Sequence, residues 1–231
     1  SMVIVNKKIY FNNSIGDISA VDIENEELLW QRPTQSSLVY DEGFYLKTSD
    51  IIADKDTLYF SNNENQFYSI DINTGTLNWQ QKVNSNLRPT LIDNYIFTVS
   101  LEGYLIVIDK TLGNILRSTD ILKQFTKKKI KEDCKFFGNW FSCKGSHIPG
   151  YYPTHKKNKK KKDKSFIEPI GFIVGKENIY LTTSKGKLLV IDVLTGDVKS
   201  TLKIDNDKIS RPSILNNNMY IIKDNSIIKL N

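Results

Sequence analysis

The chain has 231 residues, of which 39% are hydrophobic and 25% charged, with 32 Lys+Arg against 26 Asp+Glu. This composition excludes a disordered chain, and no apolar run approaches the roughly 18 residues of a membrane-spanning helix. Two cysteines exclude a small disulfide scaffold. The pI of about 9.1 indicates nucleic-acid binding only if the positive charge belongs to the fold itself.

A unit of about 40 residues recurs along the chain, a period typical of four-stranded propeller blades. Each copy has an aromatic strand, a turn, and an apolar strand that ends in Asp or at the end of the chain. The equivalent aromatic residues are Tyr10, Tyr59, Phe97, Tyr180 and Tyr220. Their spacings are 49, 38, 83 and 40 residues. The spacing of 83 equals one period plus about 43 residues, so an inserted segment interrupts the array there.

Nine repeat positions are predicted to be structural. Runs of Val, Ile, Tyr and Thr between turn residues predict short strands. The Asp carboxylates are expected to accept hydrogen bonds from turn amides, the glycines to adopt the left-handed conformation, and the tryptophans to pack between blades. These positions are Asp22, Trp30, Asp71, Gly75, Trp79, Asp109, Gly113, Asp192 and Gly196. Glu26 replaces the glycine of the first copy, and Arg117 and Ser200 stand where Trp is expected in two others.

The positive charge is confined to one segment. Residues 121–166 hold 14 Lys and three acidic residues, a net charge of +11, which leaves the rest of the chain at −5. We therefore predict about three propeller blades in 2–118, a Lys-rich inserted loop in 119–166, and one full and one partial blade in 167–231. The repeats are acidic overall, so the basic pI does not indicate nucleic-acid binding by the fold.

Both cysteines and both histidines lie in the same inserted segment. Cys134 and Cys143 are candidates for a disulfide, which fits an oxidising compartment. Unpaired thiols remain an alternative. A zinc site with His147 and His155 is another, although the spacing matches no common zinc finger.

The repeat resembles the PQQ-like (quinoprotein-type) β-propeller repeat, most clearly in 59–79 and 179–196. Within that group the chain is similar to the C-terminal part of the BamB family of outer-membrane assembly lipoproteins. The resemblance implies an all-β propeller of four-stranded antiparallel blades. About five are present, and we expect them to be part of a ring of seven or eight; a closed five-bladed ring is the alternative.

The same resemblance implies a non-catalytic scaffold for protein–protein interaction, periplasmic and associated with the outer membrane. The implied partners are a BamA-like assembly subunit or client proteins. The alternatives are a fragment of a PQQ-dependent dehydrogenase and a luminal sensing propeller. As a family, those dehydrogenases use an adjacent Cys-Cys pair, whereas the two cysteines here are nine positions apart. We assign no catalytic, cofactor-binding or metal-binding residue, no specific nucleic acid and no transmembrane segment.

The lysine run Lys156–Lys164 has three interpretations. Like charges repel and extend a chain, which favours a solvated tether. Lysines near a membrane surface are also attracted to anionic lipid head groups. Non-specific electrostatic contact with nucleic acid is the third interpretation, since no base-reading motif accompanies the run.

Overall fold

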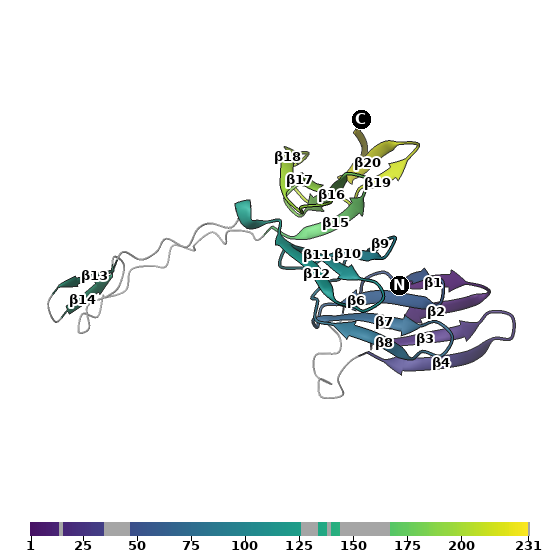
Figure 1. Ribbon diagram of the computed structural model, residues 1–231. Coiled ribbons are helices and arrows are strands. Elements are labelled where there is room, and N and C mark those ends of the chain that lie inside the picture. The colour runs from purple at the N-terminus through teal and green to yellow at the C-terminus, as the bar shows by residue number, and fades with distance from the viewer. Residues whose placement is uncertain (14–15, 35–46, 126–133, 138–139, 144–166, 231) are drawn as a thin grey trace, which may run out of the picture. The chain divides into compact units, whose positions relative to one another are not determined.

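The computed structural model describes residues 1–13, 16–34, 47–125, 134–137, 140–143 and 167–230 (Figure 1). The chain forms two compact units: Ser1–Lys123 together with Ile167–Asn231, and Gln124–Phe166. In the described ranges no helix is both long enough and apolar enough to cross a membrane.

Five antiparallel sheets in the described residues of the first unit correspond to the five sequence repeats, and we number them blades 1 to 5. Blades 1 and 2 comprise β1 (Met2–Val5), β2 (Lys8–Asn12), β3 (Asp17–Asp22), β4 (Glu27–Pro33), β5 (Ile52–Asp54), β6 (Thr57–Asn62), β7 (Gln66–Asp71) and β8 (Leu77–Gln81). Blades 3 and 4 comprise β9 (Thr90–Ile92), β10 (Tyr95–Val99), β11 (Tyr104–Asp109), β12 (Ile115–Asp120), β15 (Pro169–Val174), β16 (Asn178–Thr183), β17 (Lys187–Asp192) and β18 (Val198–Lys203). Blade 5 comprises β19 (Ser213–Leu215), β20 (Asn218–Lys223) and β21 (Ser226–Leu230). The predicted all-β architecture of propeller blades is confirmed.

Each four-stranded blade has an irregularity at the same place. The register between the third and fourth strands shifts at Ala20/Val21, Ser69/Ile70, Val107/Ile108 and Val190/Ile191. A β-bulge bends the strand and increases its local twist. Because the shift recurs, the fourth strand brings the same repeat position opposite the third strand in blades 1 to 4: Trp30, Trp79, Arg117 and Ser200.

The hydrophobic core lies between neighbouring blades. β11 illustrates this arrangement: four of its residues, 105–108, are all buried, and its sequence does not alternate between apolar and polar residues. A strand with neighbours on both faces needs apolar side chains on both. One core cluster joins blades 1 and 2, including Tyr10 and Phe60, and another joins blades 2 and 3. A smaller cluster joins blades 4 and 5 around Ile221.

The second unit contains one described hairpin, β13 (Cys134–Phe137) and β14 (Trp140–Cys143), in which Cys134 stands directly opposite Cys143. On the N-terminal side of this unit, β12 runs through Asp120 and is followed by a short 3-10 turn at Lys123–Phe125. Thr119 and Asp120, which the sequence assigns to the inserted loop, therefore belong to the last strand of blade 3.

Candidate functional site

The repeat aspartates end the third strand of blades 1 to 4 and close the turn that follows. In blade 2, Asp71 Oδ1 accepts hydrogen bonds from the Asn73 and Thr74 amides at 2.9 and 2.8 Å. Asp22, Asp109 and Asp192 accept the two equivalent amides in their own turns. The Thr74 amide is the main cause that lowers the pKa of Asp71. A carboxylate held ionised in this way is a poor general acid near neutral pH.

The turn glycine of one blade receives an aromatic side chain of the preceding blade. Gly75 has a φ of +70°, and a Cβ on it would lie 2.7 Å from the Trp30 ring. The Trp30 indole N–H donates to the Ile72 carbonyl in the same turn at 3.2 Å. Trp79 repeats the arrangement one blade further on, over Gly113 and with the Lys110 carbonyl at 3.1 Å. Both indoles thus join two blades, and we propose that their role is structural.

An arginine replaces the indole at the junction between blades 3 and 4. Arg117 donates to the carbonyls of Val193 and Leu194 in the turn of blade 4. A Cβ on Gly196 would lie 2.7 Å from the Thr119 hydroxyl. The turn of blade 1 differs again, because Glu26 adopts the left-handed conformation with a φ of 56°. The missing indole at Arg117 therefore marks a junction of different chemistry, and Glu26 takes the left-handed position that glycine holds in the other three turns.

A second set of turn caps was not predicted from the sequence. Asn13 and Asn62 each accept a hydrogen bond from the amide four residues later, between the second and third strands of blades 1 and 2. Ser100 and Thr183 do the same in blades 3 and 4. The signal in the sequence is an Asn, Ser or Thr that recurs at the end of the aromatic strand in blades 1 to 4. It is weak because Asn, Ser and Thr all satisfy the same amide.

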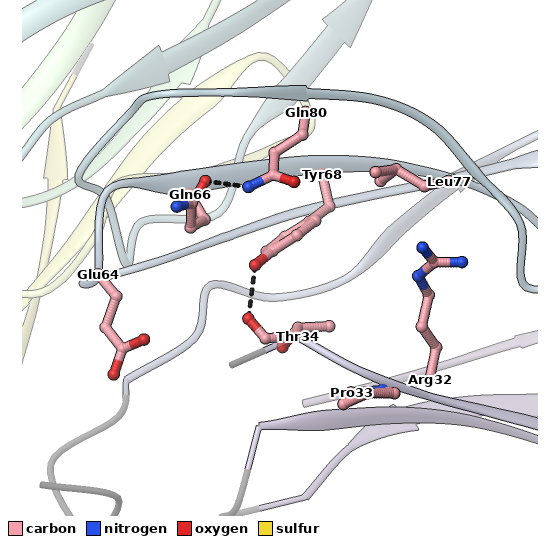
Figure 2. A pocket seen from close by; sticks show the side chains of 8 residues that line it. All are labelled: Arg32, Pro33, Thr34, Glu64, Gln66, Tyr68, Leu77 and Gln80. Carbon is pink, nitrogen blue, oxygen red and sulfur yellow. Dashed lines mark hydrogen bonds between the residues drawn. The ribbon is translucent and has the colours of Figure 1, made fainter. Parts of the chain in front are cut away.

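A polar pocket of about 320 Å³ lies between blades 1 and 2. Figure 2 shows Tyr68 between the Glu64 and Arg32 side chains. The lining residues are Arg32, Pro33, Thr34, Glu64, Gln66, Tyr68, Leu77 and Gln80. The Tyr68 hydroxyl donates to the Thr34 carbonyl at 2.5 Å. Burial is the main cause that raises the pKa of Tyr68 to about 12, so the hydroxyl remains a donor at neutral pH.

The other polar groups of the pocket are also partly engaged. Arg32 donates to the Gly75 carbonyl at 3.1 Å, and the Gln80 amide donates to the Gln66 side chain across the two strands. The pocket's one cation, one carboxylate and two side-chain amides can bind a polar side chain or a peptide backbone. No His or Cys belongs to the lining, and in the described ranges no group of three or more His, Cys, Asp or Glu residues is placed to hold a metal ion.

The remaining candidates fall outside what the structure describes. The backbone register pairs Cys134 with Cys143, but their side chains are not described. His147, His155 and the run Lys156–Lys164 lie in undescribed residues. The disulfide and the contact with anionic lipid therefore stay predictions.

The family match covers the blades that form this pocket. A sequence model of the family described as outer membrane protein assembly factor BamB matches residues 1–119, just over half of the chain. The chain belongs to this family. No curated protein sequence matches this BamB-family chain.

Solved structures support the same fold. BamB from Moraxella catarrhalis is 15% identical, with a TM-score of 0.57 over 99% of this chain and 70% of that one. The computationally designed protein Ika8 is 13% identical, with a TM-score of 0.56 over 99% of this chain and 69% of that one. The WD40 domain of Neurospora crassa Pan2 is 9% identical, with a TM-score of 0.58 over 96% of this chain and 54% of that one. At these identities the likeness extends to the propeller fold of the BamB family and no further.

Proposed function

We propose that this chain is a non-catalytic propeller scaffold that binds protein partners during the assembly of outer-membrane β-barrel proteins. The observation that carries the proposal is the BamB family match over residues 1–119. The proposed partners are a BamA-like assembly subunit or its client proteins, and the proposed location is the periplasmic side of the outer membrane.

The chemistry of the described residues supports binding better than catalysis. The repeat carboxylates hold turn amides, and both indoles of the repeat positions pack between blades. The two hydroxyls of the pocket are already engaged, since Tyr68 donates to the Thr34 carbonyl and Thr34 Oγ1 donates to the Gly16 carbonyl. The lining contains no His or Cys that would activate them.

We propose the pocket between blades 1 and 2 as a contact for a partner. Glu64 lies at the opposite side of Tyr68 from Arg32 in Figure 2, so the pocket offers both charges to a polar segment. Loops and recesses on a rigid propeller are common binding positions, because the scaffold holds them in place. The Lys156–Lys164 run would add weak attraction to anionic lipid near the membrane.

The test is co-purification of a tagged chain with a BamA-like subunit from the same source. Glu64→Lys reverses the pocket carboxylate, and we expect it to weaken recovery of the partner by about tenfold, the effect of roughly 1.4 kcal/mol. Glu177→Lys is the matched control, since Glu177 is exposed in blade 4 and far along the chain from the pocket residues.

Two results would contradict the proposal. Unchanged recovery with Glu64→Lys would exclude the pocket as the contact. If no assembly subunit co-purifies and the protein turns over an alcohol or sugar after addition of PQQ and calcium, its function is that of a dehydrogenase and not of a scaffold.

A further inference from the structure

The chain leaves blade 3 and returns in blade 4 at two firmly held positions. On the blade 3 side, the Ile121 amide donates to the Gly103 carbonyl at 3.1 Å, and the Leu122 side chain is buried against Gly103. On the blade 4 side, the Glu168 amide donates to the Ser184 hydroxyl at 3.0 Å, and the Ser184 amide donates back to the Glu168 carbonyl at 2.9 Å. Each end is thus fixed by its own blade.

Blades 3 and 4 also touch each other directly. β10 of blade 3 lies beside β15 of blade 4, and both strands carry buried apolar side chains, among them Phe97 and Phe172. The two blades also meet closely at the turn of blade 4, where a Cβ on Gly196 would lie 2.7 Å from the Thr119 hydroxyl of blade 3. Neither contact requires a covalent link between the two segments.

Arg117 adds directed bonds to this junction. Its Nη2 donates to the Val193 carbonyl at 2.8 Å and its Nη1 to the Leu194 carbonyl. In the sequence, Arg117 precedes the Gln124–Phe166 unit and both acceptors follow it. Asp192 and Asp197 add favourable charge near the guanidinium. Hydrogen bonds from a charged donor are stronger than those between neutral groups.

We propose that Ser1–Lys123 and Ile167–Asn231 form a self-sufficient interface, closed by Arg117, that persists when the covalent connection through Gln124–Phe166 is cut. The interaction surface is the part of blade 3 that carries Arg117. Its partner is the turn of blade 4 that presents the backbone carbonyls of Val193 and Leu194. The inserted unit is then an appendage that the propeller does not need for its own integrity.

The test starts from the full chain. Residues 158–163 are replaced by a site-specific protease sequence, the folded protein is cut, and complete cleavage is verified under denaturing conditions. We expect the two pieces to elute together at the volume of the uncut chain. Separation of the pieces after cutting would overturn the proposal.

Two variants test the role of Arg117. Arg117→Ala removes both bonds to the turn, and we expect the cut pieces to bind at least about tenfold more weakly, which is the scale of losing hydrogen bonds from a charged donor. Arg117→Trp supplies the group that docks on Gly75 and Gly113 in the other junctions, so we expect partial recovery.

Arg88→Ala is the matched control, because Arg88 is an exposed arginine just before β9. If Arg117→Ala binds its partner piece as tightly as the unsubstituted chain, Arg117 does not close the interface. If Arg117→Ala fails to fold, the cut but unsubstituted chain still decides whether the interface is self-sufficient.

Discussion

At the scale of single residues, the turn geometry that recurs in blades 1 to 4 depends on two requirements. A carboxylate must accept the two turn amides, and one residue must take a positive φ while leaving room for the preceding blade. Asp71 and Gly75 satisfy both in blade 2. Glycine meets the second requirement because it lacks the Cβ that would strike the Trp30 ring.

Gly75→Ala should destabilise the fold by about 2–3 kcal/mol, from the left-handed backbone and the clash with Trp30 together. Urea unfolding followed by tryptophan fluorescence measures the change. Asn73→Ala, at an exposed position of the same turn, is the control and should stay within about 0.5 kcal/mol of the unsubstituted chain. Equal midpoints for the two variants would contradict the proposed role of Gly75.

Asp192 predicts an acid-dependent loss of stability. Its side chain pairs with Lys199 at 2.7 Å, which is the main cause that lowers its pKa from 3.8 to about 2. A carboxyl with a depressed pKa contributes stability above its unfolded pKa and loses it as the pH falls through the folded value. The difference in unfolding free energy between the unsubstituted chain and Asp192→Asn should therefore shrink between about pH 4 and pH 2. Urea titrations across this range measure it, and a difference that stays constant would contradict the prediction.

At the scale of elements, the junctions between blades differ in the side chain that reaches from one blade to the turn of the next. Trp30 and Trp79 use an indole over a glycine, whereas Arg117 uses a guanidinium that reaches two carbonyls. The sequence indicates where the docking position lies, because it follows the turn at a fixed distance. It does not indicate the acceptor, since that acceptor belongs to another blade.

The β13–β14 hairpin gives a prediction for the cysteines. Cys134 and Cys143 stand directly opposite each other, and residues so placed in antiparallel strands lie about 4.5–5.5 Å apart at Cα, within the range of a disulfide. Denatured protein purified without reductant should give no free thiol in an Ellman assay and two after reduction. Two free thiols before reduction, or one bound zinc per chain, would contradict the disulfide.

At the scale of the whole molecule, charge and fold are carried by different segments. The lysine excess lies in 121–166, whereas the repeats that build the blades are acidic overall. The long-range attraction of this protein for polyanions should therefore belong to the inserted unit.

Replacing Gln124–Phe166 by a short neutral linker should abolish retention on heparin at low salt, while the full chain is retained and elutes as salt is raised. Circular dichroism of the shortened chain checks that the blades persist. Retention of the shortened chain at the same salt concentration would show that the blades themselves attract polyanions.

The sequence by itself determined the period, the strands and the turn chemistry, because these depend on side chains a few residues apart. The two amides that Asp71 accepts belong to the residues two and three positions after it. The second caps are just as local, but Asn, Ser and Thr all fill that place, so no single residue type marked them. Only the tertiary structure decided which groups meet at the junctions and where the pocket lies. Trp30 meets an acceptor 42 residues later and Arg117 one 76 residues later, across the inserted unit. Such contacts depend on how blades stack, and no local pattern encodes which turn a given side chain will reach.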